Sequence, residues 1–136
     1  MAAKSVSQNV TMSVGNVSLS FNDTSTSAVD PTPYVLGAQR VSSTIESLTA
    51  TGDIEATDHS VLLMIRNDNA TSDSNPVSLA VALDGSSATY DIYIRPQQVN
   101  LITVHRLADV RVRSWGNSGS DTVDFTYLAV QLTTSV

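Results

Sequence analysis

Residues 9–21 read NVTMSVGNVSLSF and contain the clearest structural signal in the chain. Apolar and polar side chains alternate on both sides of Gly15-Asn16, and a two-residue turn with glycine first is typical of a type II′ β-hairpin. The register across this turn pairs apolar residues with one another: Val14 with Val17, Met12 with Leu19 and Val10 with Phe21. The stretch therefore predicts two antiparallel strands that share one apolar face.

The same signals, alternation with a period of two or a short apolar run, return along the rest of the chain. They span residues 34–36, 61–65, 77–83, 90–94, 99–104, 107–115 and 123–132. The first of these segments is expected to end at Gly37, and the apolar run 61–65 is typical of a strand covered on both faces. Residues 39–50 fit both a helix and a strand, and their serines and threonines favour a strand.

These segments define the expected fold. Eight to ten short strands with turn residues between them, and no clear helix, predict an all-β protein. We expect an antiparallel β-sandwich or jelly-roll-like arrangement, as a single domain over residues 9–136. Residues 1–8 contain few apolar side chains, so we expect an N-terminal arm there that becomes ordered only against a partner.

Length, composition and charge exclude several classes of protein. The 136 residues suit one domain with a hydrophobic content of 41%, and the charged content of 15% is low for a helical bundle. A net charge of −6 argues against nucleic-acid binding. There is no cysteine, and we expect neither a secretion signal nor a membrane-spanning segment, because no apolar stretch is long enough.

No group of residues suggests catalysis. Neither His59 nor His105 has a nucleophile motif near it. Hard metal ligands gather in two groups: Asp53, Glu55, Asp58 and His59, and then Asn67, Asp68, Asn69 and Asp73. The second group lacks the spacing of a calcium-binding EF loop, and Asp and Asn are ordinary loop residues. We therefore expect no enzyme, no catalytic residue, no metal and no cofactor.

Residues 109–115, DVRVRSW, place charge and aromatic character on a face that is not the core. In an extended strand Arg111, Arg113 and Trp115 point away from the valines between them. Arg and Trp are enriched at binding hot spots, so these three residues are candidates for a protein interface. We expect Asp124, from a hairpin formed with the following strand, to lie near the arginines. The equal alternative is an edge strand protected by charge, with Trp115 covering one end of the sandwich.

Small side chains form a second candidate interface. Ala80 and Ala82 alternate with the apolar residues of segment 77–83 and so lie on the opposite face of that strand. Small side chains allow another subunit to approach closely. They are also compatible with the partly covered face of a single domain, which is the interpretation that we favour.

From about Leu48 to Leu132 the chain resembles small β-sandwich virion proteins of tailed bacteriophages. Their pattern is an apolar strand ending in Arg or Lys and Asn, a polar loop, an alternating strand, a segment y-x-i-x-l-x-P-G, a Val-rich strand, and a final strand after a Gly-rich turn. The matching stretches are residues 62–67 (LLMIRN), 76–81 (PVSLAV), 90–96 (YDIYIRP), 110–114 (VRVRS) and 122–127 (TVDFTY). Gln97 stands where the pattern has its glycine.

The resemblance implies a non-enzymatic structural protein of the virion. A capsid decoration (cement) protein fits best, with the major capsid protein or other virion proteins as partners and a homo-oligomeric state. A tail or neck component is one alternative. A carbohydrate- or receptor-binding β-sandwich is another, with residues 22–33 and 67–76 as the loops of its site, although the aromatic content of 5% is low for such a site.

Overall fold

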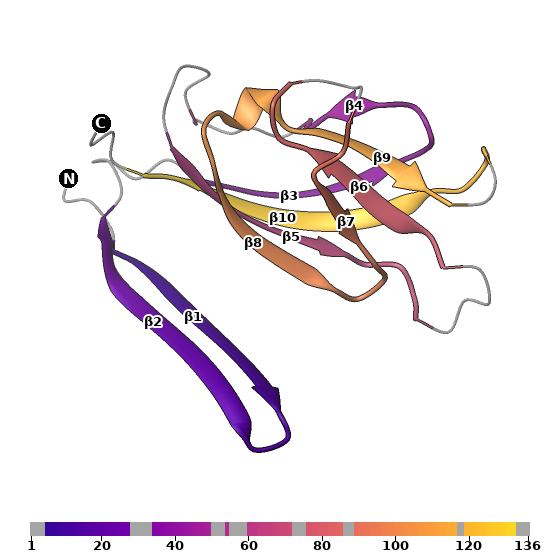
Figure 1. Cartoon of the computed structure of the whole chain (residues 1–136). Coiled ribbons are helices and arrows are strands. Elements are labelled where there is room, and N and C mark those ends of the chain that lie inside the picture. The colour runs from indigo at the N-terminus through magenta and orange to yellow at the C-terminus, as the bar shows by residue number, and fades with distance from the viewer. Residues whose placement is uncertain are drawn as a thin grey trace.

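The computed structural model describes residues 5–27, 34–49, 54, 60–71, 76–85, 89–116 and 119–132. These residues form ten strands and one short 3₁₀ helix, η1 (Figure 1). The strands are β1 (Ser5–Val14), β2 (Val17–Ser27), β3 (Tyr34–Val41), β4 (Glu46–Ser47), β5 (Val61–Asn67), β6 (Ser78–Ala82), β7 (Ile92–Ile94), β8 (Val99–Val104), β9 (Arg111–Trp115) and β10 (Val123–Gln131), and η1 is Leu107–Asp109. All the strand pairs are antiparallel, so the predicted all-β class is confirmed.

Eight of the strands form a sandwich of two four-stranded sheets. One sheet has the order β3-β10-β5-β8 and the other β4-β9-β6-β7. From β3 to β10 the chain crosses to the other sheet at every connection except the one between β6 and β7. An eight-stranded double sheet of this kind is a jelly roll, which is one of the two arrangements that the strand pattern predicted.

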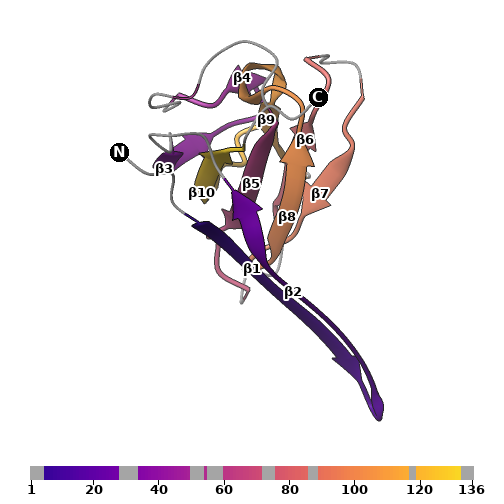
Figure 2. The ribbon, with the colours of Figure 1, turned by 90° about the vertical axis from the view of Figure 1, so that its left-hand side faces the viewer.

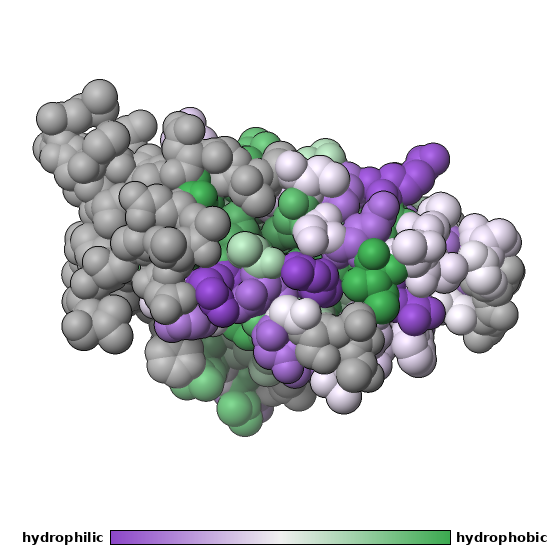
Figure 3. Space-filling model, turned by 90° about the horizontal axis from the view of Figure 1, so that it is seen from above, coloured by the Kyte–Doolittle hydropathy of each residue, from purple (hydrophilic) through white to green (hydrophobic). Residues whose placement is uncertain are grey.

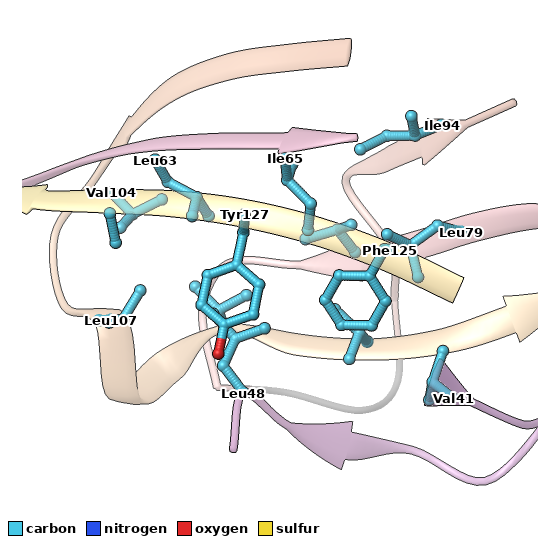
Figure 4. Packing of buried hydrophobic residues seen from close by; sticks show 14 of the residues in the cluster. Val41, Leu48, Leu63, Ile65, Leu79, Ile94, Val104, Leu107, Phe125 and Tyr127 are labelled. Carbon is cyan, nitrogen blue, oxygen red and sulfur yellow. The ribbon is translucent and has the colours of Figure 1, made fainter. Parts of the chain in front are cut away.

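The hydrophobic core lies between these two sheets (Figure 4). Along β10 every second residue is buried, so Phe125 and Tyr127 point inward with their ring centres 5.9 Å apart. Leu63 and Ile65 of β5 lie beside them, and Leu79 of β6 reaches the same core from the opposite sheet. Full burial of a large apolar side chain contributes about 1.5–3 kcal/mol, and this inward-facing set holds the sheets together.

Gly37 lies within β3, where the sequence predicted the strand to end. The strand instead continues to Val41, because Gly37 pairs with Tyr127 of β10. The tyrosine ring crosses the glycine so closely that a Cβ atom at position 37 would lie 2.5 Å from Tyr127 Cζ. The glycine is therefore a packing requirement inside the strand and does not end it.

Gly37→Ala is expected to lower the free energy of unfolding by about 1–3 kcal/mol, because the added methyl group displaces a fully packed tyrosine. Chemical denaturation followed by fluorescence measures this change. Gly119→Ala is the matched control, since a Cβ atom there meets nothing within 4 Å. Equal losses in the two variants would contradict the packing described for Gly37.

Strands β1 and β2 form a separate two-stranded sheet that extends away from the sandwich (Figures 1 and 2). The predicted register is confirmed: Val14 pairs with Val17, Met12 with Leu19 and Val10 with Phe21. Gly15 has a φ of 57° and Asn16 has no positive φ, as a type II′ turn requires. The predicted hairpin is therefore confirmed in its register and its turn, although it forms a sheet of its own outside the sandwich.

The boundary predicted for the N-terminal arm, after residue 8, is wrong. Residues 5–8 belong to β1, where Val6 pairs with Thr26. A register shift after Val6 marks a β-bulge, which allows pairing to continue past the point where the strict apolar alternation stops. The projecting segment is the whole hairpin, and the first four residues of the predicted arm lie outside the described residues.

Candidate interaction surfaces

The outer face of the β4-β9-β6-β7 sheet carries four side chains that contact one another, which we call the aromatic–arginine cluster. Arg113 and Trp115 come from β9, Tyr93 from β7 and Tyr90 from just before β7. The guanidinium carbon of Arg113 lies 5.1 Å from the centre of the Trp115 ring and 5.8 Å from that of Tyr90. Tyr93 meets Trp115 edge-on, with 5.5 Å between the ring centres.

This cluster offers exposed ring surface on a rigid support. Trp115 is 47% exposed and Tyr93 48% exposed, although both belong to strands of the sandwich. A cation–π contact at an exposed site contributes about 0.5–1 kcal/mol, so Arg113 helps to keep the rings in place. Aromatic rings give large contact area at a low cost in conformational entropy. The cluster therefore has the properties of a binding hot spot that is organised before a partner arrives.

Ala80 and Ala82 lie beneath this cluster and its neighbours. In the register of β6 and β9, Ala80 is opposite Arg113 and Ala82 is opposite Arg111. Both alanines are completely buried, so they offer no surface to a partner. Their small side chains give the long side chains on the adjacent strands room to lie across the sheet. The covered-face interpretation of these alanines agrees with the structure, and their role as direct contact residues does not.

Arg111 shares the outer face of β9 but is occupied locally. One guanidinium nitrogen donates hydrogen bonds to the carbonyl oxygens of Ala108, at 2.6 Å, and Val110, at 3.2 Å. These bonds tie β9 to the end of η1. Of the two predicted arginines, Arg113 is therefore the better contact candidate.

The upper side of the molecule in Figure 1, which carries β4, η1 and β9, is seen face-on in Figure 3. It shows hydrophobic and hydrophilic residues interspersed.

Asp124 does not lie with these arginines, and that prediction is wrong. Strand β9 pairs with β4 and β6, whereas β10 pairs with β3 and β5, so the expected hairpin does not exist. The turn before β10 carries the chain across to the other sheet. There Asp124 accepts hydrogen bonds from Arg40 Nε at 2.7 Å and from Arg40 Nη2 at 3.0 Å.

The hydrogen bonds from Arg40 hold the pKa of Asp124 below its ordinary value; desolvation opposes this effect and charge attraction adds to it. We expect an NMR titration to show this low midpoint and Arg40→Gln to raise it. A lowered folded-state pKa means that the pair stabilises the fold above the unfolded-state pKa and loses this effect as the pH falls through the folded value. Both side chains are more than half exposed, so the effect on stability is small and screened by salt. An unchanged midpoint in Arg40→Gln would refute this assignment.

The outer face of the β3-β10-β5-β8 sheet is a second candidate surface. Leu128 of β10 pairs with Leu36 on one side and with Met64 on the other, and Met64 pairs with Leu101. We call these four residues the outer apolar row, since they cross all four strands. Leu36 is 68% exposed and Met64 42% exposed, beside a hollow of about 240 Å³.

This exposure corrects the prediction that the run 61–65 is covered on both faces, but only at Met64, because Leu62 on the same outer face is buried. Val61, Leu63 and Ile65 point into the core, as expected, whereas Met64 points out. A continuous apolar run shows that both faces of a strand are apolar. It does not show that the same chain covers both of them.

Asn67, considered above as a metal ligand, is a structural residue. It ends β5 and is completely buried. Its Nδ2 donates hydrogen bonds to the carbonyl oxygens of Val77, at 3.0 Å, and Ile94, at 2.9 Å, while its Oδ1 accepts one from the N–H of Asn69. The amide thus ties β5 to β7 of the opposite sheet.

The structure describes only some of the other residues considered for chemistry. His105 is exposed directly after β8, and the first ligand group (Asp53, Glu55, Asp58 and His59) lies outside the described residues together with Asp73. Within the described part of the chain, no three His, Cys, Asp or Glu residues are placed to hold a metal ion. Of the two loops proposed for a carbohydrate site, residues 22–27 belong to β2, and 28–33 and 72–75 are outside the described residues.

Tyr90 and Tyr93 are members of the cluster that the sequence analysis missed. Tyr93 has the opposite parity to Ile92 and Ile94, and this signal alone would have placed it on the outer face. Tyr90 shares the parity of the isoleucines and so suggested a core position. A bend at Asp91 breaks that parity, and nothing in the local sequence marks it strongly.

The fold and these surfaces define an all-β jelly-roll domain with two exposed candidate interfaces. No protein-family model and no curated protein matches the chain. Among solved structures, one similar chain belongs to Bacillus endospore appendages, described as disulfide-linked pili. It is 17% identical, and the match covers 76% of this chain and 88% of that one with a TM-score of 0.45. Likeness at this level establishes neither function nor assembly. Among the described residues, no helix has the length and apolar character needed to cross a membrane.

Proposed function

We propose that this chain is a non-enzymatic structural subunit of a tailed-phage virion, and specifically a decoration protein that binds the assembled head. The observation that carries the proposal is the aromatic–arginine cluster, because the exposed rings of Trp115 and Tyr93, with the partly buried Arg113 beside them, are of the residue types that dominate protein interfaces. The jelly roll supports the virion assignment by analogy, since viral capsid domains use this fold. The strand and turn pattern that resembles phage virion proteins is the second support.

Binding would bury the rings of Trp115 and Tyr93 against apolar side chains of the major capsid protein. Arg113, already held over the tryptophan, would donate its remaining N–H groups to carbonyl or carboxylate oxygens of the shell. Each single contact contributes only a modest affinity. A shell presents many identical sites, and an oligomer that occupies several of them gains avidity beyond the single affinity.

Co-sedimentation with purified heads that lack the protein tests this proposal. The expected result is saturable binding at a fixed number of copies per head, with greater resistance of the heads to heat. Binding to isolated tails or necks, with none to heads, would move the proposal to the tail or neck alternative. Binding to no particle component would overturn it.

A carbohydrate-binding function is the second candidate, and the exposed rings of Trp115 and Tyr93 favour it, since lectins also use jelly rolls. The two rings are inclined at 68° to each other, so they do not form one flat platform. A glycan array probed with the purified chain separates the two functions. Selective binding that Trp115→Ala abolishes would favour the carbohydrate candidate.

A further inference from the structure

The hairpin of β1 and β2 has one apolar face that is exposed to solvent. Val10, Met12, Val17 and Leu19 share this face, with Met12 72% exposed and Leu19 59% exposed. An isolated two-stranded hairpin is at best marginally stable in water. A hairpin with exposed large side chains is therefore expected to be stabilised by whatever covers them.

The opposite face of the hairpin is polar. Thr11 hydrogen-bonds Ser20 at 2.9 Å between their hydroxyl oxygens, and Ser13 hydrogen-bonds Ser18 at 3.1 Å. These cross-strand hydroxyl pairs suit a surface that faces water. The two faces therefore differ in chemistry, and we expect only the apolar face to be covered by a partner.

The hairpin does not place its apolar tip on its own sandwich. Its base, from Gln8 to Thr11, borders a groove of about 580 Å³ together with Leu62, Met64 and Leu101 of the neighbouring sheet. From there the hairpin extends beyond the sandwich (Figures 1 and 2). Met12 and Leu19 do not line this groove, and both side chains are exposed.

The exposed hairpin face and the outer apolar row match in size. From Val10 to Val14 a strand rises about 13 Å, and four strands spaced at about 4.8 Å make the outer apolar row about 14 Å long. The paired strands of the hairpin, about 5 Å apart, leave room for both to rest on the sheet. The two surfaces are therefore of similar dimensions.

They also match in charge. The four residues of the apolar hairpin face and the four of the outer apolar row are all uncharged, and the one charged residue within β1 and β2, Asp23, pairs with Gln8 toward the base of the hairpin. On the same face, Arg66 pairs with Thr126 in the next cross-strand row, and Arg40 pairs with Asp124 in the row beyond it. Both arginines are already in ion pairs within the chain, Arg66 with Asp68 and Arg40 with Asp124. Contact between the two surfaces therefore buries no unpaired charge.

We propose that the apolar face of the hairpin docks on the outer apolar row of a second copy of this chain. Each copy supplies one hairpin and one row, so two copies can exchange hairpins and cover both surfaces. Reciprocal exchange doubles the area that a single docked hairpin buries, which favours a stable pair because stable interfaces typically bury about 1,600 Å². A larger ring of copies uses the same contact. The proposal does not depend on binding to a phage head.

Cysteine cross-linking tests the contact directly, because the chain has no cysteine of its own. The Met12→Cys and Leu36→Cys variants, each with a single cysteine, are mixed and oxidised gently. We expect a disulfide-linked pair that contains one chain of each kind. Ser13→Cys is the matched control, since it lies one residue away on the polar face of the hairpin. Equal cross-linking of Ser13→Cys and Met12→Cys to the Leu36→Cys chain would overturn the proposal.

Analytical ultracentrifugation over a wide range of protein concentration gives the second test. The wild-type chain is expected to self-associate, and Met12→Ser/Leu19→Ser to weaken association by on the order of a hundredfold. Leu36→Ser/Met64→Ser, on the sheet, is expected to act similarly, whereas Ser13→Ala/Ser18→Ala associates normally. Circular dichroism confirms that each variant is folded. A monomeric wild-type chain at all concentrations, or association that neither apolar double variant weakens, would show the proposal to be wrong, whatever the result with phage heads.

Discussion

Asn67→Ala is expected to lower the free energy of unfolding by about 3–5 kcal/mol, which is the largest effect on stability that we predict. The substitution leaves the carbonyl oxygens of Val77 and Ile94 buried without the amide that now donates to them. It also removes a tie between the two sheets. Urea denaturation monitored by circular dichroism measures the loss.

Asn100→Ala is the matched control for this prediction. Asn100 lies in β8, which neighbours β5, is only partly buried, and makes no side-chain hydrogen bond with the described residues. Its replacement is expected to change stability by less than about 1 kcal/mol. Similar losses for Asn67→Ala and Asn100→Ala would contradict the structural role assigned to Asn67.

Asn67→Asp adds a pH-dependent version of the test. An ionised carboxylate cannot donate a hydrogen bond to either carbonyl, whereas the protonated form can donate one. Burial raises the pKa of this carboxyl above its unfolded value, so the folded variant binds the extra proton more tightly. Relative to Asn67→Ala, its stability is therefore expected to improve as the pH falls below the folded-state pKa. A difference between the two variants that does not change with pH would argue against burial of the new carboxyl.

Trp115→Ala is expected to weaken binding to phage heads by about 30- to 1,000-fold, the range for loss of a hot-spot residue that contributes about 2–4 kcal/mol. The side chain is half exposed, so the fold itself should be little affected. Tyr34→Ala is the control, because it removes an exposed aromatic side chain from the other sheet. Titration of heads with labelled protein gives both affinities.

Arg113→Lys refines this second prediction. Lysine keeps the positive charge but loses the planar group that lies over the rings of Trp115 and Tyr90. We expect the affinity of Arg113→Lys for phage heads to lie between the affinities of the wild type and Trp115→Ala. Wild-type affinity in Arg113→Lys would show that charge alone is needed, and wild-type affinity in Trp115→Ala would remove the cluster from the interface.

The local strand pattern predicted most of the fold. Alternation and the Gly15-Asn16 turn were sufficient for the hairpin register, since both depend on residues close in sequence. The same reasoning failed between β9 and β10. The Gly-rich turn there is as suitable for a crossing between sheets as for a hairpin, and the choice depends on which strands the core brings together.

Parity showed which side chains share a face, but not what covers the face. Met64 and Ala80 illustrate this limit in opposite directions: the apolar Met64 is exposed, and Ala80, expected on an outer face, is buried by side chains of neighbouring strands. The structural role of Asn67 was harder still to predict, because its amide donates hydrogen bonds to carbonyl groups that are 10 and 27 residues away in sequence. A buried asparagine and a loop asparagine look the same in the sequence.

Electron cryomicroscopy of phage heads incubated with the purified chain tests the central claim most directly. If the chain is a decoration protein, density for a jelly roll will appear at regular positions on the shell, with Trp115 and Arg113 against the capsid protein. Heads that remain bare at saturating concentration, or bound copies whose Trp115 faces the solvent, would contradict the proposed mode of attachment.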